Sequence, residues 1–114
     1  MKGSSYEEMA ASFFLQKMYT VLERNYRRKT GEIDLIVKDP ESFAVVFVEV
    51  KFRKKNKNGA PEEAVNQKKQ LRIYRTAEWY IQEKHLSPSG KYRFDVISIL
   101  DGKLTHIKNA FGGF

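Results

Sequence analysis

Three charged residues interrupt an otherwise apolar part of the chain, and their types suit metal-assisted chemistry. Asp34 lies in a short β-branched run, while Glu49 and Lys51 lie near the end of a longer run rich in Val and Phe. Two carboxylates brought together away from water repel each other, and one lysine balances only one of their charges. A divalent cation such as Mg²⁺ or Mn²⁺ binds hard oxygen ligands and keeps some of its waters. If the two acids meet, these residues predict a metal site.

The elements around these residues determine whether the acids meet. Residues 33–37 and 43–52 have strand character, and an Asp-Pro-Glu-Ser turn lies between them. With a four-residue loop at positions 40–43, opposed positions in an antiparallel hairpin sum to 83, so Asp34 is expected opposite Glu49. Glu49 and Lys51 share a face because side chains alternate along a strand. Both faces of the second strand are otherwise apolar, which is typical of a covered central strand.

Composition narrows the class of protein. The chain has 114 residues, enough for one domain, and we expect a single domain over residues 1–114. Its 21 basic and 14 acidic residues give a net charge of +7, which favours a polyanionic partner such as nucleic acid. The absence of cysteine excludes a disulfide scaffold and a thiol nucleophile. No signal peptide and no apolar run of the ~20 residues needed to span a membrane is recognisable, so a cytoplasmic protein is expected.

The order of predicted elements is helix, three strands, helix and two strands. An Asp followed on the next strand by Glu-x-Lys is the signature of the PD-(D/E)xK nuclease superfamily. From about Glu7 to Phe111 the chain further resembles the YraN-like family of small bacterial proteins, which is similar to archaeal Holliday junction resolvases. The blocks that carry this resemblance are residues 24–27, 31–36, 47–51, 93–96 and 109–111. Two residues depart from the pattern: Ile33 stands where the superfamily has proline, and Met18 where the family has glycine.

The resemblance implies a restriction-endonuclease-like α/β fold, a central mixed sheet flanked by helices in the order α-β-β-β-α-β with an added C-terminal strand. It implies that Asp34 and Glu49 bind Mg²⁺ or Mn²⁺, with the Val50 carbonyl and Glu7 as further ligands. Lys51 would orient or help to deprotonate the attacking water. Glu7 also fits a capping box at the start of the first helix, so capping alone remains an alternative. We interpret Glu32 as a structural or supporting residue that faces away from Asp34.

Residues 19–24 are expected to form the first strand. Two basic runs, residues 24–29 and 52–59, are expected to form loops beside this site. Each is either a solvated loop or a contact for a nucleic-acid backbone. A helix predicted from Pro61 to about Lys84 carries Lys69, which the resemblance selects although it would otherwise count as an ordinary exposed lysine. The candidate nucleic-acid-binding residues are Arg24, Arg27, Arg28, Lys29, Arg53, Lys54, Lys55, Lys57 and Lys69.

The function expected from these residues and from the resemblance is that of a metal-dependent endonuclease. DNA is favoured over RNA, and branched DNA and a homodimer are expected only by analogy with the resolvases. A nucleic-acid-binding module of the same fold that does not cleave is the alternative. A third hypothesis is a structural ion-pair cluster in a small interaction protein. Asp95, inside an apolar strand beside Arg93, is interpreted as structural.

Overall fold

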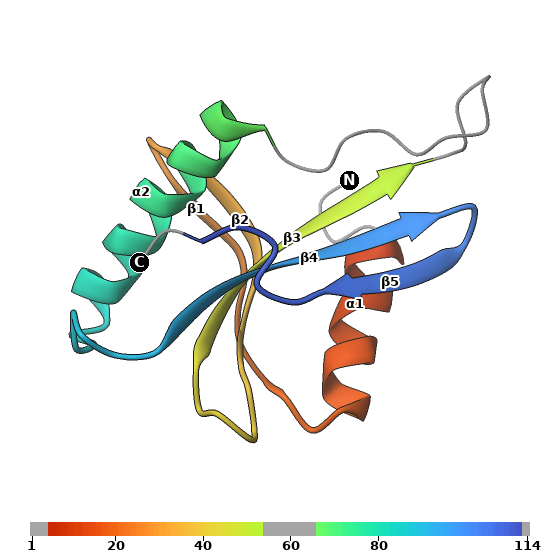
Figure 1. Cartoon of the computed structure of the whole chain (residues 1–114), viewed down its shortest axis with the longest axis horizontal. Coiled ribbons are helices and arrows are strands. Elements are labelled where there is room, and N and C mark those ends of the chain that lie inside the picture. The colour runs from red at the N-terminus through yellow and green to blue at the C-terminus, as the bar shows by residue number, and fades with distance from the viewer. Residues whose placement is uncertain (1–4, 54–65, 113–114) are drawn as a thin grey trace.

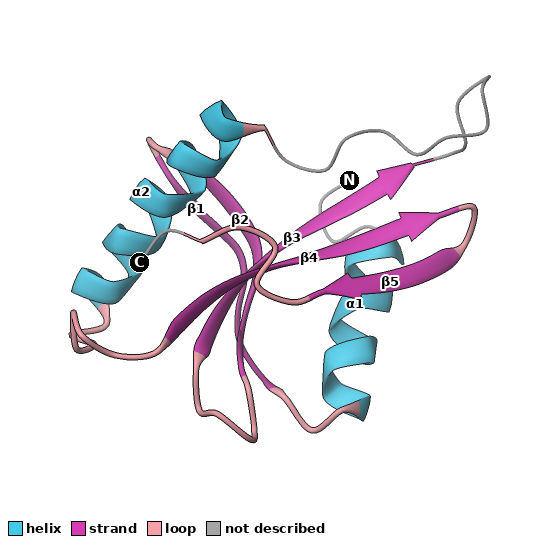
Figure 2. Ribbon diagram, viewed as in Figure 1, coloured by secondary structure: helices cyan, strands magenta, loops and turns pink. Residues whose placement is uncertain are grey.

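The structure is a computed structural model that describes residues 5–53 and 66–112. Its elements, in chain order, are α1 (Ser5–Gln16), β1 (Thr20–Arg28), β2 (Gly31–Lys38), β3 (Val45–Arg53), α2 (Gln67–Glu83), β4 (Tyr92–Leu100) and β5 (Lys103–Ile107). The strands form one sheet in the order β1-β2-β3-β4-β5, in which β3 and β4 are parallel and the other pairs antiparallel (Figure 2). The predicted order of elements is therefore confirmed, as an α/β fold with a mixed sheet and two helices.

The two helices pack on opposite faces of the sheet. Phe14 of α1 belongs to one buried cluster together with Val48, and Tyr80 of α2 belongs to the other together with Phe47. Because Phe47 and Val48 are neighbours on β3, this strand is buried on both faces, as the sequence predicted for a central strand. Burying a side chain of this size contributes roughly 1.5–3 kcal/mol. Figure 1 shows α2 beside β1 and β2 and α1 near the other end of the sheet.

The β2–β3 hairpin has the predicted register. Its ladder runs from the pair 38 and 45 to the pair 35 and 48, so that opposed positions sum to 83. The loop is closed by the N–H of Asp39, which donates to the carbonyl of Ala44, and the Asp39 side chain accepts the N–H of Glu41. The predicted start of the second strand at Phe43 is wrong. Phe43 has a φ of 63° and is 68% exposed in the loop, and β3 begins at Val45.

The predicted end of the first strand is also wrong. β1 does not stop at Arg24 but continues through Arg28, so most of the first basic run is strand rather than loop. The reason is the aromatic residue within the run: Tyr26 is buried and pairs with Ile33 of β2, which keeps the chain in the sheet. The arginines on either side then occupy exposed positions of an edge strand.

Helix α2 begins later than predicted. Asn66 is its N-cap, and the Asn66 side chain accepts the N–H of Lys69 at 2.9 Å. Asn66 itself has an extended backbone, so the predicted helix is not continuous through this residue. The predicted start near Pro61 lies outside the described residues. At the end of α1, Met18 has a φ of 70°, a left-handed conformation in which glycine carries no steric cost. The resemblance predicts glycine at this position, and this backbone conformation gives the physical reason for it. In this chain Met18 adopts the same conformation.

A buried polar network ties β4 to the β2–β3 turn. Asp95 is fully buried, and it accepts hydrogen bonds from Arg93, from His106 Nε2 at 2.7 Å and from the N–H of Asn109. Arg93 also donates to Asp39 at 2.8 Å. Although burial acts to raise it, the hydrogen bonds from His106 and Arg93 hold the pKa of Asp95 below its usual value. Asp95 thus has the structural role predicted for it.

Neither of the two described helices is both long and apolar enough to cross a membrane.

Candidate functional site

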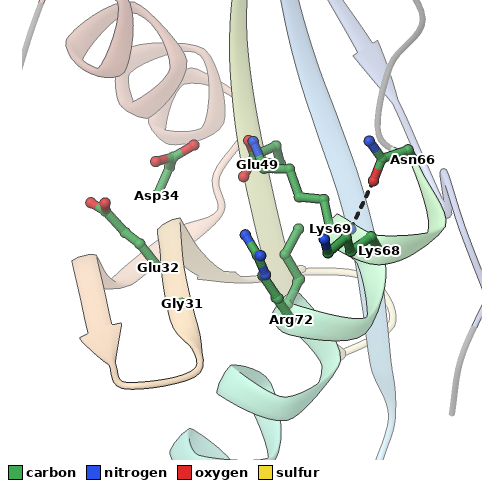
Figure 3. A pocket seen from close by; sticks show the side chains of 9 residues that line it. Gly31, Glu32, Asp34, Glu49, Asn66, Lys68, Lys69 and Arg72 are labelled. Carbon is green, nitrogen blue, oxygen red and sulfur yellow. Dashed lines mark hydrogen bonds and ion pairs between the residues drawn. The ribbon is translucent and has the colours of Figure 1, made fainter.

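A cleft opens where β2 and β3 separate. The ladder between these strands reaches Leu35 and Val48, and one residue further along β2 Asp34 Oδ2 accepts the N–H of Val50 at 2.7 Å. The Asp34 side chain thus takes the place of a strand partner and is fixed between the two strands. The cleft has a volume of about 570 Å³ and is lined by Gly31, Glu32, Asp34, Glu49, Asn66, Lys68, Lys69, Arg72 and Ile73 (Figure 3).

Asp34 is the most strongly perturbed acid of the cleft. Burial raises the pKa of Asp34 to about 7, and the negative charges of Glu49, Glu7 and Glu32 act in the same direction. The hydrogen bond from the Val50 N–H opposes this shift by stabilising the carboxylate. A carboxyl group held near its midpoint at neutral pH would be converted to the ionised form by a bound cation.

Glu49 lies beside Asp34 and already has a cationic partner. It is only 8% exposed, and its Oε2 lies 2.6 Å from Lys69 Nζ. Lys69 comes from the first turn of α2, whose start is fixed by the Asn66 cap. In Figure 3 the Lys69 side chain extends across the cleft to Glu49. Lys69, the α2 residue that the resemblance selected, thus lies at the acidic site.

Lys51 and Val50 lie next to these acids on β3. Lys51 is half-buried two residues beyond Glu49, so the alternation of the strand places both side chains on one face, as predicted. Val50 presents its N–H to Asp34. The participation of the Val50 carbonyl in metal binding remains a prediction.

Glu7 and Glu32 approach the same cleft from two different elements. When the Asn25 amide is oriented with its nitrogen toward the carboxylates, it donates to Glu32 at 3.2 Å and to Glu7 at 3.3 Å. The interpretation that Glu32 faces away from Asp34 is wrong, because residues two apart on a strand share a face and both line the cleft. Strand alternation alone could have found Glu32. Asn25 lies in the block 24–27 that carries the family resemblance, but its bridging of Glu7 and Glu32 depends on how α1 packs beside β1 and could not be predicted from that block.

The donor set of the cleft favours one class of metal. Among residues 5–53 and 66–112, no three His, Asp or Glu side chains converge closely enough to hold an ion by themselves. Asp34 and Glu49 are two hard oxygen donors in an open cleft, which suits Mg²⁺, since this ion is commonly held by one or two carboxylates and several waters. The set does not suit a structural zinc site, which requires four protein ligands. Glu7 acts on Asp34 through its charge but does not complete a three-residue ligand group.

Most of the described basic candidates outside the cleft are engaged with acids. Arg24 pairs with Glu8 at 2.8 Å, Arg27 with Glu32 at 3.4 Å, and Arg28 with Glu83. Exposed ion pairs of this kind contribute little, about 0–1 kcal/mol, so a phosphate could replace the acid. Of the remaining candidates, Lys29 is exposed in the β1–β2 turn and Arg53 ends β3, whereas Lys54, Lys55 and Lys57 lie outside the described residues.

Comparison with known proteins gives one family match over most of the chain. The family described as "Uncharacterised protein family UPF0102" matches residues 6–99, which include the whole cleft. A UPF0102 protein of Lachnoclostridium phytofermentans is 40% identical over all of this chain and 95% of its own length. Those of Pelobacter propionicus and Thermodesulfovibrio yellowstonii are 45% and 43% identical over 96% of this chain, covering 81% and 94% of their own lengths.

Proposed function

The chain belongs to the UPF0102 family, and we propose that it is a metal-dependent phosphodiester hydrolase acting on nucleic acid. The observation that carries the proposal is the meeting of Asp34 and Glu49 where β2 and β3 separate, with Lys51 on the same face. The order of strands and helices agrees with the restriction-endonuclease-like fold implied by the PD-(D/E)xK resemblance. We include that fold in the proposal.

In this proposal Asp34 and Glu49 hold Mg²⁺ or Mn²⁺ through their carboxylate oxygens. When bound, the ion lowers the pKa of a coordinated water and offsets the charge that develops on the phosphate. The Val50 N–H fixes the Asp34 carboxylate between the strands, so this donor is positioned before any ligand arrives. The Lys51 ammonium orients the attacking water and balances phosphate charge from the same face.

Nucleic acid is proposed as the substrate because the cleft is acidic on one side and basic on the other. Asp34 and Glu49 lie on the strands, whereas Lys68, Lys69 and Arg72 line the cleft from α2. Cations on this helix can hold the phosphates that flank the scissile bond. The net charge of +7 favours the same partner. The preference for DNA, for branched DNA and for a homodimer rests on the resemblance to junction resolvases.

A second candidate is a binding module of the same fold that does not cleave. The observation that favours it is the contact of 2.6 Å between Lys69 and Glu49, which supplies a positive charge to the acidic site from within the protein. If that ion pair persists when nucleic acid is bound, a metal ion has only Asp34 as a charged partner.

A cleavage assay distinguishes the two candidates. Labelled linear duplex, single-stranded and four-way-junction DNA are incubated with the wild type in Mg²⁺, in Mn²⁺ and in EDTA. The hydrolase proposal expects product only with metal, and a loss of at least about 100-fold in rate for Asp34→Asn and for Lys51→Met. Asp101→Asn, in the exposed β4–β5 turn, is the control and should cleave as the wild type does. Full metal-dependent activity in Asp34→Asn would refute the assignment, and metal binding without product would favour the binding module.

A further inference from the structure

The face of the sheet that carries Glu49 and Lys51 continues beyond the cleft onto β4 and β5. The strand registers align side chains of three strands in rows across this face. The rows are Glu49 with Val96 and Ile107, Lys51 with Ser98 and Thr105, and Arg53 with Leu100 and Lys103. The acidic site is thus at one end of a surface whose other end is basic and hydroxyl-bearing.

The two faces of this part of the sheet differ in chemistry. On the opposite face, Ile97 and Ile99 are fully buried in the cluster that contains Phe14 of α1. On the face of the rows, Lys103 and Thr105 are exposed. Helix α2 packs mainly on β1 and β2, and Figure 1 shows it at the end of the sheet away from β5. The ends of β3, β4 and β5 therefore form a surface adjoining the cleft, in which the exposed Lys103 and Thr105 lie beside the apolar Leu100 and Ile107.

We propose that this surface binds the phosphate backbone of a duplex nucleic acid and leads it into the cleft, an inference that rests on the proposed function. Lys51, Arg53 and Lys103 provide cations for phosphate oxygens, and the hydroxyls of Ser98 and Thr105 provide neutral donors. These are contacts that position a backbone without reading its sequence. Ser98, Lys103 and Thr105 thereby become substrate-positioning residues outside the acidic site.

The dimensions of the surface suit a stretch of backbone rather than a single phosphate. Glu49 and Lys103 are separated by two strand spacings, about 10 Å, and by four residues along the strands, about 13 Å. The diagonal of about 16 Å corresponds to roughly five base steps of a duplex at about 3.4 Å each. When the scissile phosphodiester bond lies in the cleft, phosphates several base steps further along the duplex would therefore lie above Lys103.

The chemistry of the surface favours a duplex over a single strand. Sheets that bind single strands without a fixed sequence stack bases on aromatic side chains. None of the nine residues in the three rows is aromatic. The aromatic residue of this part of β3, Phe52, points to the other face, where its ring stacks on Tyr6 at a centroid distance of 3.7 Å. The rows thus offer contacts to phosphates and no platform for unpaired bases.

The test is a binding titration of the full chain in EDTA, where no cleavage interferes. The fluorescence anisotropy of a labelled duplex of about 20 base pairs is followed from low to high salt. Lys103→Glu should weaken binding about tenfold near 0.1 M salt and lower the slope of log K against log salt by about 1. Lys91→Glu, the same charge change at an exposed position just before β4, should stay within about twofold of the wild type. Thermal melting confirms that both variants are folded.

A second variant separates the hydroxyl contacts from general charge. Thr105→Val keeps the β-branched shape and removes only the donor, so we expect a loss of roughly 2- to 5-fold with little change in the salt slope. An equal loss in Lys103→Glu and Lys91→Glu would overturn the inference, since only net charge would then matter. Tighter binding of the matching single strand than of the duplex would overturn it as well.

The outcomes also separate this surface from the hydrolase proposal. Duplex binding that depends on Lys103, without any metal-dependent cleavage, would support the surface and refute the hydrolase. Metal-dependent cleavage by a Lys103→Glu variant whose duplex affinity is unchanged would refute the surface alone. Absence of any duplex binding by the wild type would refute both.

Discussion

Replacing Asp34 with asparagine should stabilise the metal-free protein while destroying its proposed function. The carboxyl group is half-buried beside Glu49, and its pKa is raised from 3.8 to about 7. The folded state therefore binds this proton more tightly than the unfolded state does. The resulting stabilisation is complete below about pH 4 and is lost as the pH rises through 7. The amide that replaces the carboxyl group has no proton to lose, and its oxygen can still accept the Val50 N–H that Asp34 accepts now.

The size of the effect follows from the same shift. Each factor of ten in proton affinity is worth about 1.4 kcal/mol, so ionised Asp34 costs the folded state at most about 4 kcal/mol at pH 8. At pH 5 part of that cost is already present, because the unfolded state has released its proton. The difference in unfolding free energy between Asp34→Asn and the wild type should therefore grow by about 2–3 kcal/mol from pH 5 to pH 8, in favour of the variant.

The assay is urea unfolding in EDTA at both pH values, followed by circular dichroism. Asp101→Asn is the matched control, because Asp101 is exposed in a turn with a φ of 50°, a conformation that asparagine tolerates. Its unfolding free energy should follow that of the wild type at both pH values. A difference between Asp34→Asn and the wild type that does not grow with pH would refute the electrostatic account of the cleft. So would a variant that is less stable than the wild type at pH 8.

Two other substitutions test the ion pairs of the structure. Arg93→Met leaves the buried carboxylate of Asp95 without its guanidinium partner and should lower the free energy of unfolding in urea by about 3–5 kcal/mol. Lys91→Met, at an exposed neighbouring position, should lower it by less than about 0.5 kcal/mol. Similar losses in the two variants would contradict the role of the network. Lys69→Gln removes the ammonium that contacts Glu49, so calorimetry should show Mn²⁺ binding roughly 3- to 10-fold more tightly than in the wild type. Weaker Mn²⁺ binding in that variant would mean that Lys69 supports the site instead of competing for it.

The hairpin that carries the acids could be predicted because its determinants are local. The Asp-Pro-Glu-Ser turn fixes the length of the loop, and the loop length fixes which residues of the two strands oppose each other. The opposition of positions 34 and 49 follows from these two features alone. Glu32 could have been placed by the same alternation, so its misassignment reflects a rule applied wrongly rather than a missing signal.

The boundary of β1 could not be predicted because its determinants are distant. Arg24 and Arg28 read locally as a solvated run, but their partners Glu8 and Glu83 belong to the two helices. The cap of α2 at Asn66 is a local signal, unlike these long-range ion pairs. Long-range pairs of this kind leave no periodic pattern in the sequence. The role of Lys69 likewise depends on the distance between α2 and β3.

Binding of Mn²⁺ tests the central claim most directly, because Asp34 and Glu49 are held to form one site. Titration of the ion into the wild type, Asp34→Asn and Glu49→Gln, followed by electron paramagnetic resonance, counts bound ions without requiring a substrate. The account predicts about one ion per wild-type chain and a loss of affinity of at least about 10-fold in each variant, as expected when a carboxylate ligand becomes an amide. Binding in both variants that equals the wild type would contradict it.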